Sequence, residues 1–462
     1  MAPAYLPPFW QRRPWLAALL GKIAAWKRRA EGEEGVVAAA PSDHSPLPPS
    51  PPASAVLPTP VPPVPEAATP AAAPAPVTKP EARRRPRAAL VRTALPAPPP
   101  PPLALPPHAS APLSPERSIA IALQGGGAHG AFTWGVLDRL LDDPHIHFDS
   151  VSGTSAGAMN AVVLAYGLIS GGRKGAQDLL ATFWRRIAEA GRLSPFRRSW
   201  LDRLEGGWSM DRSPWLALMD VARQFVSPYQ TNPLGLNPLR EVLDSLVDFQ
   251  ALRSQDRIRI HVAATDVHSG QPTIFSTREL DCHRVMASAC LPHLFQAVEI
   301  DGVPYWDGGY LCNPPLMPLV QHSRADDLVV VPINPHCRLG TPRTARDIFN
   351  RMNEITFNSS LHQGLETLAL LNSLTDRGDL RPGAYRRMRL HVIDADDEFR
   401  RLTASSKVNT EWDFLTYLHD VGRAAAERWL AEHRDALGRR DSAALPPPPA
   451  WLVQPDPIPL AT

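Results

Sequence analysis

Short apolar runs and longer helical patterns alternate along the middle of the chain. The apolar runs have the length of buried strands and lie at 118–123, 258–264 and 327–333. The stretches whose apolar residues recur at helical spacing lie at 158–167, 177–190, 239–247, 344–372 and 411–433. Because strands that alternate with helices favour a parallel sheet covered on both faces, the pattern predicts an α/β fold: a three-layer sandwich with a largely parallel central sheet.

Further strands are predicted where the pattern is shorter. Runs at 271–276 and 387–393 are β-prone, and an Asp-Gly pair at 301–302 between two short apolar runs indicates a hairpin whose second arm ends at Asp307. By contrast, 193–238 is rich in tryptophan and shows no regular period. A long irregular segment of this kind is either a lid beside a site or a satellite cluster packed on the core.

Proline divides the chain into parts of different character. About half of the 53 prolines lie in 41–115, where alanine and serine fill much of the rest. This composition is too poor in large apolar side chains to offset the entropy of ordering, so we expect a disordered tether before the folded part. The tether contains the run Arg83-Arg-Arg-Pro-Arg87. We expect this run to be solvated, with contact to phosphates or acidic lipid as the alternative.

The charge balance and the cysteines exclude several classes of function. With 48 basic and 46 acidic residues the net charge is +2, so no global field points to nucleic acid as a partner. The four cysteines form no pair suited to zinc, and no carboxylate-rich calcium loop occurs, so we expect reduced, mostly buried thiols and no metal or cofactor. No apolar run approaches the roughly 20 residues that cross a bilayer, so no transmembrane span is predicted.

The first 40 residues combine apolar and basic positions. Leu16, Leu19, Ile23 and Trp26 recur at helical spacing among basic residues, which indicates a short amphipathic helix that docks on an anionic membrane or a partner. A helix that packs on the protein itself or frays in water explains the same pattern. Twin arginines before this patch resemble an export signal only faintly, because Lys22 interrupts the apolar stretch.

Glycines gather between the first predicted strand and the helix that follows it. Gln124-Gly-Gly-Gly127-Ala-His-Gly130 lies where a helix N-terminus offers unpaired N–H groups and a positive dipole end, which favour an anion. A dinucleotide loop is the rival interpretation, because Asp149 lies near the spacing at which such a loop has its acidic partner. Asp149 leads directly into another motif, so we favour an oxyanion hole formed by Gly125, Gly126, Gly127 and Gly130.

The motif after Asp149 is Gly153-Thr-Ser155-Ala-Gly157, at a predicted strand end before an apolar helix. Glycines two residues on either side of the serine allow a sharp turn that lifts the hydroxyl above the sheet, so Ser155 is the candidate nucleophile. The motif is weak by itself, because small residues also fill ordinary strand-to-helix turns.

A third motif, Asp307-Gly308-Gly309, ends the predicted hairpin. An ester hydrolase needs a nucleophile, a base that takes its proton, and donors for the oxyanion that forms. Asp307 can act as the base if burial raises its pKa enough for the carboxylate to accept a proton near neutral pH. Asp-Gly-Gly is also a common plain turn, so this motif gains its meaning from the other two.

In this order, the glycine loop, Gly-x-Ser-x-Gly and Asp-Gly-Gly closely resemble the marks of the patatin-like phospholipase family. Further similarities are Ala264-Thr-Asp266, Ala287-Ser-Ala289, Leu291-Pro292 and Asn313-Pro314, and the resemblance covers about 119–331. It implies a Ser155/Asp307 dyad without histidine that hydrolyses fatty-acyl esters in lipids, of the phospholipase A or lysophospholipase type. A lipid or membrane surface is then the expected partner. The chain departs from the family at His129, where the loop usually carries Lys or Arg.

Two other functions fit parts of the sequence. In an α/β-hydrolase triad, Ser155 would pair with a late histidine, for which the candidates are His322, His336, His391 and His419. In a non-catalytic scaffold, the basic N-terminus and the tether would reach a membrane without any turnover. The dyad predicts instead that none of these histidines is essential and that Ser155→Ala abolishes the release of fatty acid.

The expected organisation has five parts. They are a basic amphipathic segment at 1–40, a disordered linker at 41–116, a patatin-like catalytic domain at 117–335, a mainly helical region packed on the core at 336–440 and a proline-rich tail at 441–462. The expected location is cytoplasmic, with peripheral attachment to a membrane through the first segment.

Overall fold

The computed structural model describes residues 117–192, 198, 202, 207–211, 213, 218, 225–381 and 385–447. The predicted amphipathic segment, the tether with its basic run and most of the tail lie outside these residues, and the irregular segment 193–238 is described only in part. All four cysteines are free. Cys282 and Cys290 are buried as expected, whereas Cys337 is exposed.

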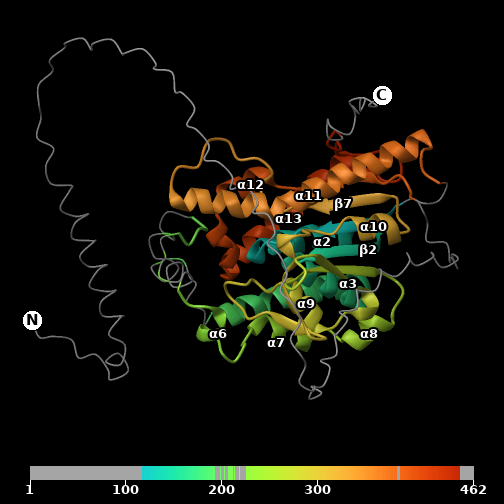
Figure 1. Ribbon diagram of the computed structural model, residues 1–462. Coiled ribbons are helices and arrows are strands. Elements are labelled where there is room, and N and C mark those ends of the chain that lie inside the picture. Colours follow the sequence, from blue (N-terminus) through green and yellow to red (C-terminus); the bar gives the residue numbers. More distant parts are fainter. Residues whose placement is uncertain are drawn as a thin grey trace, which may run out of the picture. The chain divides into compact units, whose positions relative to one another are not determined.

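An eight-stranded sheet forms the centre of the described part (Figure 1). Its strands are β1 (Ser118–Leu123), β2 (His147–Thr154), β3 (Arg259–Asp266), β4 (Pro272–Ser276), β5 (Val298–Ile300), β6 (Val303–Asp307), β7 (Asp327–Val331) and β8 (Arg389–Val392). Their order is β5-β6-β3-β2-β1-β7-β8, with β4 paired to β3. The run β3-β2-β1-β7-β8 is parallel, and β4, β5 and β6 form antiparallel pairs. The predicted largely parallel sheet is therefore confirmed.

Alternate side chains of the central strands belong to two separate apolar clusters. Along β1, Ile119 and Ile121 lie in one cluster, whereas Ala120 and Ala122 lie in the other. Because successive side chains of a strand point to opposite faces, both faces of the sheet are buried. This explains why the strand reads in the sequence as an unbroken apolar run.

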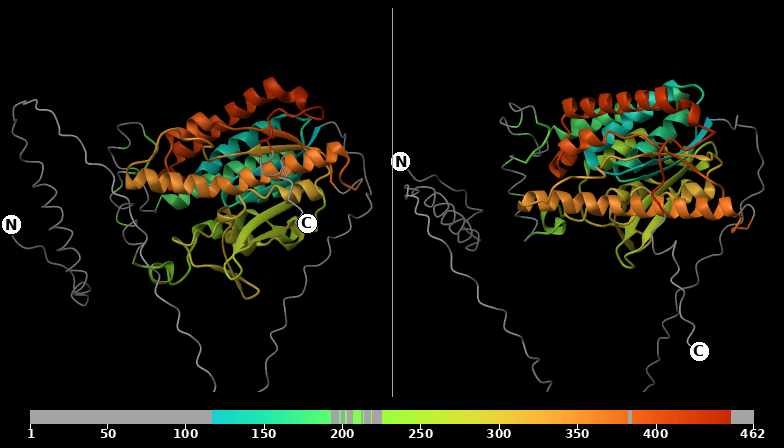
Figure 2. Two further views of the ribbon diagram at one scale, coloured as in Figure 1. Left: turned by 45° about the horizontal axis from the view of Figure 1, so that its top comes forward. Right: turned by 90° about the horizontal axis from the view of Figure 1, so that it is seen from above.

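Helices cover both faces and so complete the three layers (Figure 2, right). One face is covered by α2 (Gly130–Asp142), α3 (Ala156–Gly191) and α13 (Trp412–His433), and the other by α10 (Met317–His322) and α11 (Ala345–Arg377). The remaining elements are η3 (Gly127–His129), α6 (Pro228–Thr231), α7 (Pro238–Leu246), α8 (Phe249–Ser254), η4 (Thr277–Glu279), α9 (Cys282–Ser288), η5 (Gly308–Tyr310), α12 (Asp396–Arg401), η6 (Ala404–Val408) and η7 (Arg434–Ala436).

The two helices predicted at 158–167 and 177–190 are the two arms of α3. They meet at Gly172, which has φ 63° and ψ −154° and interrupts the helical conformation. Only glycine adopts such a backbone conformation readily, so the kink is encoded by a residue that apolar periodicity does not register.

The C-terminal helix α13 packs along α2, although about 280 residues separate them in the chain. Asp138 on α2 accepts from Arg423, and its Oδ2 lies 3.2 Å from Nε2 of His419. Hydrogen bonds from both partners, together with their charge, lower the pKa of Asp138 although burial opposes this. The region after the central sheet is thus fixed to the first helix of the fold. None of the described helices is long and apolar enough to cross a membrane.

Candidate active site

Ser155 sits at the sharp turn between β2 and α3. Its backbone has φ 54° and ψ −121°, a conformation that is rare for a residue with a side chain, and its N–H donates to Oγ of Ser288 at 2.9 Å. A Cβ added to Gly157 would lie 2.1 Å from the Leu123 carbonyl oxygen. The helix start therefore approaches β1 so closely that only glycine fits, which gives the spacing of the motif a physical cause.

The glycine loop is held beside Ser155 by a set of buried amides. A Cβ added to Gly125 would lie 2.9 Å from Cβ of Ser155. The Gly125 N–H donates to Oδ1 of Asn313 at 2.6 Å, and Nδ2 of Asn334 donates to the Gly125 carbonyl at 3.1 Å. Gln124 adds to this frame because its Oε1 accepts from the Asn334 N–H at 3.0 Å.

The four glycines predicted for the oxyanion hole have different positions. The amide of Gly125 is engaged by Asn313, and that of Gly130 caps η3 by donating to the Gly127 carbonyl. Gly126 and Gly127 line the pocket that contains Ser155. Of the four glycines, Gly126 and Gly127 therefore border the pocket, whereas the amides of Gly125 and Gly130 are bonded within the protein.

Asp307 ends β6 and is completely buried. Its Oδ1 accepts from the Gly309 N–H at 2.7 Å, whereas its Oδ2 is buried with no hydrogen-bond partner. Burial raises the pKa of the Asp307 carboxyl to about 7, while the Gly309 N–H, the Ser155 side chain and the charge of Lys407 act in the opposite direction. The carboxyl is therefore poised to exchange a proton near neutral pH.

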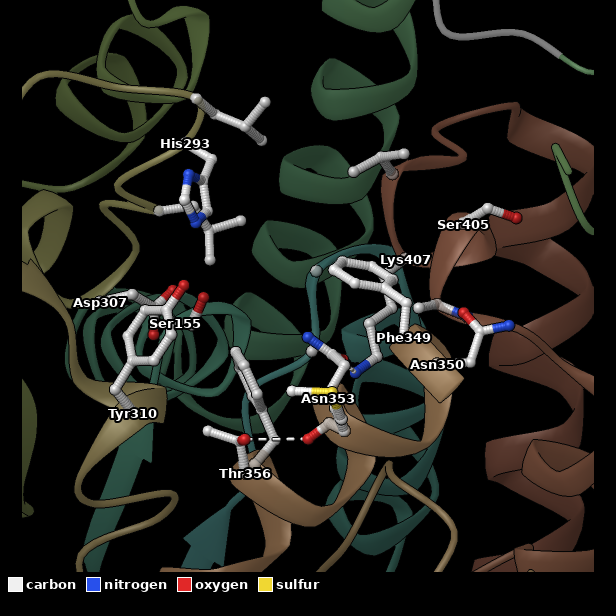
Figure 3. Close-up of a pocket in the computed structure, with 18 of the residues that line it drawn as sticks. Ser155, His293, Asp307, Tyr310, Phe349, Asn350, Asn353, Thr356, Ser405 and Lys407 are labelled. Carbon is white, nitrogen blue, oxygen red and sulfur yellow. Dashed lines mark hydrogen bonds between the residues drawn. The ribbon is translucent and has the colours of Figure 1, made fainter. Parts of the chain in front are cut away.

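Ser155 and Asp307 come together at one end of the pocket (Figure 3). The Ser155 side chain is close enough to lower the pKa of Asp307, but no hydrogen bond of ordinary geometry joins the two side chains. Their proximity is compatible with proton transfer between them, because hydrogen bonds of this kind are often poorly aligned before a substrate is bound.

Lys407 is a third polar group in the pocket, and no sequence motif predicts it. It comes from η6, and its Nζ donates to Oδ1 of Asn353 at 2.7 Å and lies 4.9 Å from the ring centroid of Phe357. Burial lowers the pKa of Lys407 to about 8, against the attraction of Glu354 and Asp307. The ammonium group is the form that prevails at neutral pH, so it adds a positive charge to the site.

His129 anchors the glycine loop without carrying a charge. Its Nε2 is 2.7 Å from Oγ of Ser406, and its ring packs against Phe399 with 5.3 Å between the centroids. Burial lowers the pKa of His129 to about 3, and the charge of Lys407 adds to this effect. The imidazole is consequently neutral at physiological pH, and Lys407 supplies the positive charge that acts on it.

Asp149, the acidic residue of the dinucleotide interpretation, binds residues away from the glycine loop. Asp149 is near the start of β2, whereas the glycine loop and Ser155 are at the strand ends from which the helices begin. Its Oδ2 accepts from Ser323 Oγ at 2.9 Å and from the Arg324 N–H at 2.8 Å, and it lies 3.2 Å from Arg259. A carboxylate held in this way cannot reach a ribose bound at the glycine loop.

The four late histidines considered for a triad do not line the pocket. His391 bonds to Asp327 and Ser442, and His419 bonds to Asp138 and Asp420. His322 stacks near His261, and His336 lies near His362. His293 does line the pocket. No sequence signal selects it, because it follows Leu291-Pro292 in a loop without a catalytic motif.

The pocket has a volume of about 350 Å³, which is within the range of small-molecule sites. One wall consists of Leu291, His293, Leu294 and Tyr310. The other wall comes from α11 and η6, and its residues are Arg346, Phe349, Asn350, Met352, Asn353, Thr356, Phe357, Ala404, Ser405, Lys407 and Val408. Both walls thus contribute apolar side chains beside polar ones, an arrangement suited to an acyl chain with a reactive polar end. The described residues include no cluster of His, Cys, Asp and Glu that could hold a metal ion.

Comparisons with known proteins agree with the motifs. Residues 121–320 match the family model described as patatin-like phospholipase. A cGAMP-activated phospholipase of Vibrio cholerae serotype O1 is 23% identical over 219 residues, which are 42% of this chain and 54% of that protein. The match thus spans about half the length of this curated relative.

Two solved structures are similar at low identity. VipD from Legionella pneumophila has a TM-score of 0.29 at 14% identity, and the match covers 67% of each chain. The ExoU-SpcU complex of the type III secretion system of Pseudomonas aeruginosa has a TM-score of 0.23 at 16% identity, with coverage of 70% of this chain and 61% of that one. On the family match, residues 121–320 form a patatin-like phospholipase domain.

Proposed function

We propose that the chain is a serine acyl hydrolase that cleaves fatty-acyl esters of lipids, of the phospholipase A or lysophospholipase type. The observation that carries this proposal is the buried Asp307 carboxyl, with a pKa of about 7 and an unpartnered Oδ2, next to the Ser155 hydroxyl. A carboxyl in this state accepts the proton of a nucleophile near neutral pH, which an exposed carboxylate does poorly.

The reaction then proceeds in two halves. Oγ of Ser155 attacks the acyl carbon while its proton moves to Oδ2 of Asp307, and the N–H groups of Gly126 and Gly127 stabilise the oxyanion. When the carbon–oxygen bond to the alcohol breaks, Asp307 returns the proton to the leaving oxygen. Water, deprotonated by Asp307, releases the fatty acid from the acyl-enzyme and restores the serine.

The surroundings favour a lipid as the substrate and as the partner. The apolar walls suit an acyl chain, and the charge of Lys407 is complementary to a phosphate or to a developing negative charge. From the sequence we further propose that the enzyme is cytoplasmic, works at a lipid surface and needs no cofactor. The boundaries 117–335 and 336–440 also remain proposals, and α11 and η6 of the second part contribute to the pocket.

A histidine base is the second candidate mechanism, because His293 lies in the pocket. In that case the imidazole would take the serine proton and Asp307 would serve only to shape the turn. Both mechanisms make an acyl-serine, so they differ only in which substitution removes the base.

The test compares Ser155→Ala, Asp307→Asn and His293→Gln in the full chain, on a soluble short-chain ester and on phospholipid micelles. We expect the first two to lower kcat by about 10²–10⁴-fold or more and His293→Gln to change it by less than about fivefold. A large loss with His293→Gln and little loss with Asp307→Asn would favour the histidine base. Labelling of Ser155 by a fluorophosphonate checks the nucleophile separately, and a wild type that neither reacts nor releases fatty acid would support a scaffold.

A further inference from the structure

Exposed apolar side chains are concentrated in two segments of the described residues. Twelve large hydrophobic residues are exposed there, and nine of them lie in 225–236 or 339–355. Scattered single exposures are normal for a folded protein, but two clusters beside one pocket require an explanation.

The first cluster is a stripe on the N-terminal half of α11. Ile348, Met352 and Ile355 recur at helical spacing and are 43%, 62% and 53% exposed, and Phe349 beside them is 61% exposed. Such a stripe normally faces a core. On α11 the core contacts begin later, at Phe357, so the stripe is open to solvent. Phe349 and Met352 also line the pocket, and the stripe therefore continues into it (Figure 3).

The second cluster surrounds α6 and includes Tyr229, Leu234 and Leu236. Tyr229 Oη accepts from the Ala297 N–H at 3.3 Å, and Nε2 of Gln296 donates to the Asn232 carbonyl at 2.7 Å. These contacts attach the α6 segment to the loop whose residues 291–294 form the wall of the pocket opposite α11. In Figures 1 and 2, α6 and the N-terminal end of α11 lie on the same side of the fold.

Positive charge accompanies the stripe. Arg343 and Arg346 are exposed beside Ile348, and Arg346 lines the pocket. Of the two acidic residues in the same segment, Glu354 is buried and paired with Arg338 and Arg351. Asp347 is exposed and accepts from Thr344 Oγ1 at 2.7 Å, so the exposed arginines outnumber the exposed carboxylate. Apolar side chains next to exposed arginines are the combination that binds an anionic lipid interface.

We propose that the two clusters form the docking surface that places the mouth of the pocket on an anionic lipid surface. The inference rests on the proposed function and adds to it the route of the substrate. A protein seated on both clusters would cover the pocket, whereas a lipid surface supplies acyl chains to it. A lipid could then enter between α11 and α6 without its acyl chain crossing water.

The test uses two variants whose changed residues are exposed and do not line the pocket. They are Ile348→Gln/Ile355→Gln on α11 and Leu234→Gln/Leu236→Gln near α6. Gln363→Ala/Thr367→Ala is the matched control, because these positions are exposed on the same helix beyond the stripe. Hydrolysis is measured in the full chain on phosphatidylcholine vesicles that contain phosphatidylglycerol, and on a soluble short-chain ester.

We expect each glutamine pair to lower vesicle hydrolysis by about tenfold. Two isoleucine or leucine side chains that insert partly into the lipid surface contribute about this much to binding. Soluble-ester hydrolysis by the variants should stay within about twofold of wild type, and the control should change neither activity. Vesicle hydrolysis, and not vesicle binding, is the primary measurement, because residues 1–40 could hold the chain on a vesicle without placing the pocket on the lipid surface.

Unchanged vesicle hydrolysis in both glutamine pairs would overturn the docking surface and leave the proposed function intact. Absence of soluble-ester hydrolysis in the wild type would count against the proposed function instead. In that case sedimentation of Ser155→Ala with vesicles, with and without the glutamine pairs, still tests the docking surface. A glutamine pair that dissociates a wild-type dimer while vesicle hydrolysis is unchanged would show a protein interface, and would refute lipid docking.

Discussion

The substitution Asp307→Asn is expected to remove activity and at the same time to stabilise the fold at neutral and alkaline pH. The Asn side chain is neutral at every pH, has nearly the same shape and can still accept from the Gly309 N–H through its oxygen. It cannot accept the proton of Ser155, so hydrolysis is expected to fall by about 10²–10⁴-fold. The stability gain arises because an ionised carboxylate in this buried position is unfavourable.

The magnitude follows from the difference in pKa between the folded and unfolded states. Burial raises the pKa of Asp307 from 3.8 to about 7. Between these values the folded state keeps a proton that the unfolded state has lost, so the wild-type free energy of unfolding falls as the pH rises through this window. About three pKa units correspond to about 4 kcal/mol. The attraction between Asp307 and Lys407 is already contained in this net shift, so we expect the variant to gain about 4 kcal/mol above pH 7.

Urea unfolding of both proteins between pH 4 and pH 9 measures this difference. The free-energy gap between Asp307→Asn and wild type should be small near pH 4 and should widen as the pH rises to about 7. Asp256→Asn is the control, because the Asp256 side chain is 81% exposed and its pair with Arg278 is expected to contribute less than about 0.5 kcal/mol at every pH. Parallel curves for wild type and Asp307→Asn would refute the raised pKa and remove the physical reason for naming Asp307 the base.

Three further predictions test other parts of the site and the sheet. The kcat/KM of the wild type should rise with pH, with an apparent pKa of about 7. Lys407→Met should raise this apparent pKa by up to about one unit, because the lost ammonium charge no longer favours the carboxylate form of Asp307. Gly157→Ala should abolish hydrolysis and destabilise the fold by more than about 2 kcal/mol in urea unfolding, because its Cβ would lie 2.1 Å from a carbonyl oxygen of β1. Asp149→Asn should cost about 3 kcal/mol in the same assay, because it leaves Arg259 without its buried partner, while kcat of the folded fraction stays unchanged.

Apolar patterning predicted the parallel part of the sheet because those strands are buried on both faces. The run at 118–123 is β1, and the run at 327–333 contains β7, which ends at Val331. The hairpin that ends at Asp307 was also predicted, because its turn residues are local signals. The kink at Gly172 was not predicted, since it depends on one backbone conformation and not on a periodic pattern.

The long helix α11 shows how a correct local prediction can miss the function of an element. Its helical spacing was evident from 344 onward, and an apolar stripe at that spacing ordinarily indicates burial. The stripe at Ile348, Met352 and Ile355 is nevertheless exposed, while Phe357 and Leu361 of the same helix are buried. Which segment of the helix faces the core depends on the elements packed against it, and the spacing within its own sequence does not record them.

His129 and Lys407 illustrate the same limit within the site. Taken alone, a histidine in place of the family's usual Lys or Arg suggests a loop whose charge varies with pH. The structure instead gives a neutral imidazole bonded to Ser406, and the next residue, Lys407, places its amine in the pocket. The two positions are 278 residues apart, so no motif spacing connects them. Loop anchoring and positive charge, which one basic residue could provide together, are here divided between two residues, and one of these lies outside the matched residues 121–320. A C-terminal segment that the family match does not cover is therefore part of the electrostatics of the proposed dyad.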